Sequence, residues 1–351
     1  MTDSSAADGS FASAAAVAAD EAPAMEAPAR AWASGWRSLL LRPEMGLPLI
    51  LLLLGIYLSL SSQYFLQYQN LLNITQAVAV VGIAAAFATV VMIGGGIDLT
   101  PVTVMVMSGI VCLHALNSGL PVPIVVVLAL GASLGIGLVN GMFVAVGVLN
   151  PFIVTLGTNF LFTGIAYVVT DGNSQLISST SFASIGQAHI PGNIPVSTLI
   201  MFGTFLLAFL LLRATRFGIH VFAVGGGEDA ARLSGVRVRT VKVGLYSLSA
   251  LSAGLAGVVQ ASAGGSVAPY AASSSNDLLT ILAAVIIGGT ALSGGRGTVG
   301  GTLVGILLLG VIGNGLVLEN VSSFWQPVVT GTILLVAIVL DETRRRLQPI
   351  R

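Results

Sequence analysis

Five amide side chains inside otherwise apolar stretches are the residues best suited to hold a polar ligand by hydrogen bonds. They are Gln76, Asn140, Asn159, Gln260 and Asn314. An amide both donates and accepts hydrogen bonds, and a path for a neutral hydroxylated solute needs such groups without a fixed charge. The alternative is that each amide bonds to a neighbouring helix, which contributes roughly 0.6–2 kcal/mol per contact. Since the apolar stretches contain no buried ion pairs, they indicate an uncharged solute.

Asp98 is the most unusual acidic residue of the first half of the chain. It lies in the sequence GGGIDLTP, between Gly96 and Thr100. A carboxylate near membrane depth costs several kcal/mol unless it is partnered or hydrated. We expect a structural turn in which Asp98 and Thr100 accept the free N–H groups of the following helix. The alternative is a proton or cation site.

Motifs for enzymatic chemistry are missing from the sequence. It contains no Walker A sequence, no Gly-x-Ser-x-Gly and no His-Glu-x-x-His. Its one lysine, Lys242, is not in a phosphate-binding loop. The stretch Gly295-x-Gly297-x-x-Gly300 matches a dinucleotide fingerprint only formally, because it follows no strand and opens an apolar run. The three histidines show no metal-ligand spacing, and the single Cys112 reads as a small buried side chain. We therefore expect no catalysis, no cofactor and no metal.

The composition requires a membrane. Hydrophobic residues make up 55% of the chain and charged residues 8%, whereas a soluble domain carries about 25% charge. We predict an all-α integral membrane protein with about ten transmembrane helices and a possible internal repeat. The predicted spans are about 46–62, 74–93, 100–116, 122–147, 152–170, 196–212, 243–262, 278–292, 299–318 and 325–340. Residues 1–42 are predicted to be a disordered tail with an interface segment, 43–343 the transmembrane domain, and 344–351 a basic tail.

The basic residues define an orientation. If the N-terminus is cytoplasmic, all fourteen Lys and Arg residues fall before the first span, in inner loops or in the C-terminal tail. Both termini are then cytoplasmic. Because the net charge is zero and the basic residues flank apolar segments, nothing indicates binding to nucleic acid.

The longest inner loop, residues 213–242, contains six of these basic residues. Its middle predicts a short helix in which Glu228 and Asp229 occupy the first turn and Arg232 lies on the same face. Gly225, Gly226 and Gly227 are expected to form a flexible lead, and Gly235 to end the helix. An ordinary connecting loop is the alternative.

Glycines recur elsewhere at spacings that favour close helix packing, as in Gly131/Gly135, Gly137/Gly141 and Gly301/Gly305. The sequence around Gly94–Gly96 is also echoed at Gly288–Thr290. This echo is the evidence for the possible internal repeat.

Three motifs resemble those of a known family, the permease subunits of ribose-type sugar importers of the ATP-binding cassette (ABC) class. Residues 95–100 (GGIDLT) resemble its S-G-I-D-L-S turn, and 287–297 (IGGTALSGGRG) resemble its G-G-T-S-L-x-G-G-x-G stretch. Residues 225–236 (GGGEDAARLSGV) resemble its G-G-N-E-x-A-A-x-L-S-G-I coupling segment, with Gly227 in place of Asn. The similarity covers roughly residues 45–345.

The resemblance implies partners and a location. Such permeases work as homo- or heterodimers in the bacterial inner membrane, with cytosolic ATPases below and a periplasmic sugar-binding protein above. It further implies that the 213–242 loop docks on the ATPase. The residues it assigns to this ATPase coupling are Gly225, Gly226, Glu228, Ala231, Arg232, Ser234 and Gly235. The remaining alternatives are an ion-driven secondary transporter that uses Asp98, and an ABC permease for branched amino acids.

Overall fold

The structure is a computed structural model that describes residues 46–146, 149–273, 275–322, 324–332, 335 and 339. Of its two compact units, Met1–Gly46 is described only at Gly46, and Leu47–Arg351 contains everything discussed below. The predicted tails 1–42 and 344–351 lie outside the described residues, as does part of the predicted span 325–340.

The described part of the second unit is mainly helical. Its helices are α3 (Gly46–Ser61), α4 (Tyr68–Ala77), α5 (Ala79–Ile93), α6 (Pro101–Asn117), α7 (Val122–Ala145), α8 (Pro151–Thr170), α9 (Thr180–Gln187), α10 (Val196–Ala214), α11 (Arg216–Gly226), α12 (Glu228–Leu233), α13 (Val238–Gly264), the 3-10 helix η2 (Pro269–Ser273), α14 (Ser275–Ile287) and α15 (Val299–Leu318). Residues 325–332 are also helical. The strands are two residues each: β1 (Gln175–Leu176) pairs antiparallel with β4 (Ser266–Val267), and β2 (His189–Ile190) with β3 (Ile194–Pro195).

Among the described residues, six helices are long and apolar enough to cross a membrane, or seven if a bent pair counts as one. That pair is α4 and α5, which meet at Val78 with a bend of 52°. The predicted second span therefore begins earlier than residue 74 and is broken. α3 and α6 are shorter apolar helices. The chain is a multi-pass helical membrane protein, while the count of ten spans stays a prediction.

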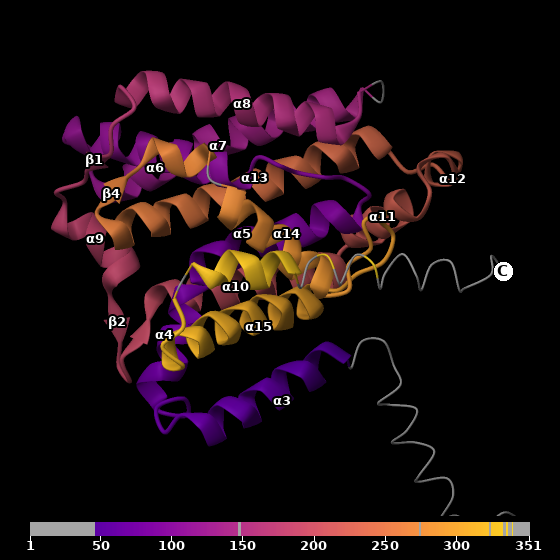
Figure 1. The fold of residues 1–351 in the computed structure, drawn as a ribbon. Coiled ribbons are helices and arrows are strands. Elements are labelled where there is room, and N and C mark those ends of the chain that lie inside the picture. Colours follow the sequence, from indigo (N-terminus) through magenta and orange to yellow (C-terminus); the bar gives the residue numbers. More distant parts are fainter. Residues whose placement is uncertain are drawn as a thin grey trace, which may run out of the picture. The chain divides into compact units, whose positions relative to one another are not determined.

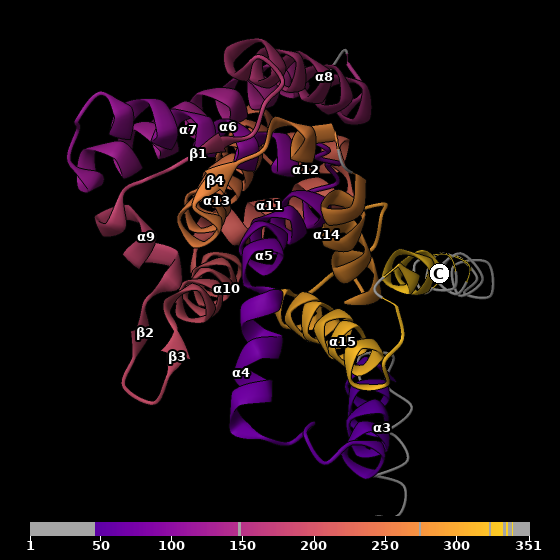
Figure 2. The same cartoon turned by 60° about the vertical axis from the view of Figure 1, so that its left-hand side comes forward.

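α5 and α13 form the core of the unit. Nearly every residue of α5 is buried, and α5 contacts α10, α13, α14 and α15. α13 also contacts α6 and α7 (Figures 1 and 2). The outer helices expose large apolar side chains, such as Phe160 at 67% and Val168 at 78% on α8. Such surfaces suit lipid as the surrounding solvent.

Some of the predicted glycine pairs do permit close helix packing. A Cβ added at Gly137 would lie 2.6 Å from the Tyr246 carbonyl oxygen, and one at Gly141 would lie 2.7 Å from Val243 Cα, so α7 meets the α13 backbone directly. At Gly301 and Gly305 an added Cβ would overlap carbonyl oxygens at the end of α14.

For Gly131 and Gly135 the described residues show no such close packing. An added Cβ at either position would have no heavy atom of the described chain within 4 Å. These two residues lie on the same helix as Gly137 and Gly141, but on a face that packs against nothing described here. Spacing alone does not say which face of a helix meets a neighbour.

Candidate functional site

The 213–242 loop contains two helices rather than one. α11 begins after Thr215, whose Oγ1 accepts a hydrogen bond from the Gly218 N–H at 3.2 Å. It continues through Gly225 and Gly226, so these glycines are not the flexible lead that the sequence predicts. Only Gly227, with extended backbone, separates α11 from α12. Figure 1 shows α11 and α12 near the start of α13.

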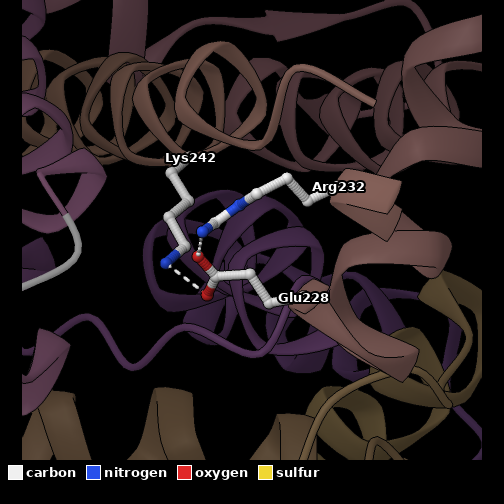
Figure 3. A network of polar contacts seen from close by, with 3 residues as sticks. All are labelled: Glu228, Arg232 and Lys242. Carbon is white, nitrogen blue, oxygen red and sulfur yellow. Dashed lines mark hydrogen bonds and ion pairs between the residues drawn. The ribbon is translucent and has the colours of Figure 1, made fainter. Parts of the chain in front are cut away.

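One acidic residue, Glu228, holds α12 against α13. The two carboxylate oxygens of Glu228 each face one cation, Arg232 Nη2 at 3.0 Å and Lys242 Nζ at 2.6 Å (Figure 3). The pair with Arg232 has the predicted i,i+4 spacing. The pair with Lys242 joins α12 to α13 across fourteen residues, and the lysine side chain is only 14% exposed.

The end of α12 has a defined turn. Gly235, at φ +83°, donates its N–H to the Arg232 carbonyl, and the Val236 N–H reaches the Ala231 carbonyl, both at 3.0 Å. This is the Schellman ending that a glycine in the left-handed region favours. Ser234 Oγ donates to the Ala230 carbonyl at 2.9 Å.

α12 has one anchored face and one open face. Ala231 is buried, whereas Leu233 is 91% exposed. A free apolar side chain beside a fixed charge pair is a surface that a partner protein can cover.

A basic groove of about 560 Å³ lies next to α12. Its lining residues are Ala145, Val146, Arg232, Val236, Arg237, Val238, Arg239 and Thr240. Within the described residues, Arg237 and Arg239 form no ion pair with a carboxylate. The groove therefore attracts negative charge.

Asp98 lies in a buried polar turn. Its Oδ1 accepts from the Thr100 N–H at 2.9 Å and from the Thr100 hydroxyl at 2.6 Å, while Oδ2 accepts from Ser249 Oγ at 2.8 Å. Thr100 is the residue preceding α6, but its side chain caps no N–H of that helix. The predicted capping arrangement is thus wrong in detail, since the Thr100 hydroxyl donates to Asp98 instead. Gly96 approaches the same α13 helix, where an added Cβ would lie 2.7 Å from the Tyr246 hydroxyl.

The five predicted amides are not gathered in one site. Asn140 Nδ2 donates to Thr100 Oγ1 at 3.2 Å, and its Oδ1 has no partner among the described residues. Asn159 Oδ1 accepts from the Thr103 hydroxyl. Asn314 on α15 and Asn70 on α4 bond to each other, at 2.8 and 3.1 Å.

Gln76 lies on α4 and Gln260 on α13, both partly buried. For Asn159 and Asn314 the observed contacts are the interhelical bonds of the alternative interpretation. Asn140 belongs to the Asp98 turn. A translocation path through these amides stays a prediction.

The three motifs of the sequence meet at one point. Ile93, just before the first motif, accepts a hydrogen bond at its carbonyl from the Gly295 N–H at 2.8 Å. A Cβ added to Gly225 would overlap that same carbonyl oxygen and lie 2.6 Å from Gly295 N. One added to Gly294 would lie 2.6 Å from Gly95 Cα. We call these residues, 93–95, 225–226 and 294–295, the glycine junction.

Sequence reasoning missed Lys242 and Ser249 as site residues. It assigned Gly225 and Gly226 to ATPase coupling but did not predict that they meet residues 93–95 and 294–295 in the glycine junction. The contacts of Lys242 and Ser249 span 14 and 151 residues, so no local pattern reveals them. The glycine runs were a usable signal for the junction, because glycine also occurs where a backbone must approach another group closely.

Comparisons with known proteins agree along most of the chain. Residues 70–338 match the family described as branched-chain amino acid transport system / permease component. The chain is 38% identical over 303 residues to the ribose import permease protein RbsC of Bacillus subtilis (strain 168), covering 86% of this chain and 93% of that protein.

Two further relatives have similar coverage. The RbsC protein of Escherichia coli (strain K12) is 36% identical over 308 residues, 87% of this chain and 95% of that protein. The L-arabinose ABC transporter permease protein AraH of Azospirillum brasilense is 32% identical over 320 residues, 91% of this chain and 92% of that protein. No solved structure matches the chain.

Proposed function

The chain belongs to the branched-chain amino acid transport system / permease component family, and on that premise we propose that it imports a monosaccharide or similar polyol as the membrane subunit of an ABC importer. As a permease component it is a transport subunit and not an enzyme. The observation that carries the choice of sugar is the 38% identity, over 86% of the chain, to a ribose import permease.

The chemistry of the apolar segments supports a neutral solute over an amino acid. The family description names branched-chain amino acids, which carry two opposite charges at neutral pH. A path for them needs charged groups or helix ends directed at both charges. Among the described residues both ion pairs involve Glu228, which lies in the 213–242 loop, and the deeper of its two partners, Lys242, lies in the first turns of the candidate span 238–264 rather than in its middle. The relatives described above are named for ribose and L-arabinose.

In this proposal the energy for transport comes from ATP hydrolysis by a separate cytosolic ATPase that binds α12. The ion pairs of Glu228 hold α12 in place, and exposed Leu233 offers it an apolar contact. The groove beside Arg237 and Arg239 supplies positive charge for acidic groups of the partner. A periplasmic sugar-binding protein and a second permease subunit complete the proposed assembly.

The proposed topology keeps ten spans, cytoplasmic termini and a place in the bacterial inner membrane. Figure 1 supports it by placing β1, β4 and α9 at the end of the helices away from α11 and α12. Residues 171–195 and 263–277, expected outside, contain no Lys or Arg, whereas 213–242 contains six. A charge difference of this kind sets orientation in inner membranes.

Reconstitution tests the proposal. The chain is purified with its cognate ATPase, placed in proteoliposomes with the binding protein, and offered labelled ribose or leucine. We expect ribose uptake that requires ATP and disappears with a hydrolysis-deficient ATPase. Uptake that ignores ATP and stops with an uncoupler would instead support the ion-driven alternative. ATP-dependent uptake of leucine alone would support an amino acid permease.

A further inference from the structure

We propose that the glycine junction is the positioning contact through which movement of α12 reaches the buried helix α5 and the turn between α14 and α15. This inference rests on the proposed function, in which a partner ATPase moves α12. It assigns a role in transport to Gly225, Ile93 and Gly295 that depends on their backbone atoms rather than on their side chains.

The Ile93 carbonyl is the centre of the junction. At the end of α5, the Gly95 N–H bonds to the Met92 carbonyl and the Gly96 N–H to the Val91 carbonyl, at 3.0 Å each. This Schellman ending leaves the Ile93 carbonyl without a partner in its own helix. The Gly295 N–H supplies that partner at 2.8 Å, so the end of α5 is bonded to the turn that leads into α15.

Gly225 brings the ATPase-facing loop to the same atom. Because an added Cβ would overlap the Ile93 oxygen, the backbone of α11 lies directly on the end of α5. Gly294 and Gly295 form the third side of the junction. A Cβ added to Gly295 would lie 2.8 Å from Gly226 Cα, so this position has no room for a side chain. Both have positive φ, +80° and +72°, which a glycine adopts without strain.

A contact between backbones transmits displacement better than one between long side chains. Side chains absorb small shifts by changing rotamer, whereas close-packed backbone atoms at a helix end have no such freedom. α12 is separated from α11 only by Gly227. α5, in turn, is buried against α10, α13, α14 and α15. A shift of α12 that moves α11 must therefore move α5 as well.

The first experiment compares Gly225→Ala with Gly300→Ala in the complete transporter. A Cβ at Gly300 meets no heavy atom within 4 Å, and Gly300 lies in the first turn of α15, five residues after the junction. ATP hydrolysis and sugar uptake are measured in the same proteoliposomes. We expect Gly225→Ala to assemble with the ATPase and hydrolyse ATP, but to transport about five- to tenfold fewer sugars per ATP. Gly300→Ala should keep the wild-type ratio.

If Gly225→Ala transports as many sugars per ATP as the wild type, the proposal is overturned. This holds whether hydrolysis and uptake are both unchanged or both fall by the same factor, because either result describes a purely structural residue. If the wild type itself shows no ATP-dependent uptake, the proposed function fails instead.

A second experiment needs no substitution and covers the case in which Gly225→Ala fails to assemble. Hydrogen exchange of peptides covering 291–297 is followed in the wild-type complex with and without trapped ATP. We expect the Gly295 amide to stay protected in both states, as the junction moves as one body. Fast exchange in either state means that the junction opens, which overturns the proposal.

Discussion

Two serines on α13 differ sharply in what their hydroxyls contact, although they are two residues apart. Ser249 Oγ donates to the carboxylate of Asp98, which is 5% exposed. Ser247 Oγ is buried and has no partner among the described residues. The Asp98 turn is thus held from a distant helix.

Replacing these serines tests how much the Asp98 turn depends on α13. Ser249→Ala leaves one carboxylate oxygen of Asp98 without its donor, which costs about 1.5–3 kcal/mol. We expect a lower melting temperature for the detergent-solubilised protein. Ser247→Ala removes a hydroxyl that forms no bond, so its melting temperature should be equal or higher. Equal losses in both variants would contradict the contact with Asp98.

The charge pairs of Glu228 give a second residue-scale prediction. Glu228→Gln removes the charge that faces Arg232 and Lys242, whereas Asp229→Asn removes an acid from the same helical turn without breaking either pair. Because Glu228 is partly exposed, the lost stability should be about 0.5–1 kcal/mol. Uptake should fall more in Glu228→Gln than in Asp229→Asn, as measured by ATP-dependent transport. Equal uptake in the two variants would argue against α12 as the coupling helix.

At the residue scale, the sequence predicts contacts between residues that are close along the chain and misses contacts between distant ones. The pair of Glu228 with Arg232 follows from helical spacing. The pair with Lys242 depends on how α12 folds back on α13. The role of the Thr100 hydroxyl is mispredicted because a hydroxyl can donate as well as accept a hydrogen bond. It donates to Asp98 Oδ1 instead of accepting from an N–H at the start of α6.

At the element scale, boundaries follow the sequence where a helix is apolar and ends at a glycine or a charged loop. The ninth predicted span coincides with α15, Val299–Leu318. The eighth predicted span, 278–292, is shifted toward the C-terminus relative to α14. The helix ends at Ile287, and Gly289 turns the chain at φ +85°. α11 was missed because its two final glycines suggest a flexible loop when contacts are unknown.

The packing of α7 on α13 supplies a matched pair of variants. Gly137→Ala places a Cβ 2.6 Å from the Tyr246 carbonyl oxygen, while Gly135→Ala places one in open space. Overpacking of a close contact costs about 1–3 kcal/mol. We expect Gly137→Ala to lower the melting temperature by several degrees and Gly135→Ala to leave it unchanged or raise it. A reversed order would mean that α7 is rotated about its axis relative to the arrangement described here.

At the scale of the whole molecule, orientation follows from charge and is tested by labelling. Cys112 is fully buried and is the single cysteine, so a Cys112→Ala background accepts reporter cysteines. Leu176 on β1 is 78% exposed and Leu233 on α12 is 91% exposed. We expect a membrane-impermeant thiol reagent added outside spheroplasts to label Leu176→Cys and not Leu233→Cys.

Permeabilised spheroplasts are the control for that experiment, since both cysteines should then react. Labelling of Leu233→Cys from outside intact spheroplasts would overturn the proposed topology and, with it, docking of an ATPase on α12. The solute itself lies beyond what charge and hydropathy can predict, because the amides that suggested it are spread over several helices.

Lys242 gives the molecule a natural site for selective chemical modification. It is the chain's one lysine, and its amine is held 2.6 Å from Glu228. An amine-selective acylating reagent therefore has only this side chain and the N-terminal amine to modify. The rate at which Lys242 is acylated during turnover, measured by mass spectrometry, would record how often α12 separates from α13 in a protein that carries no substitution.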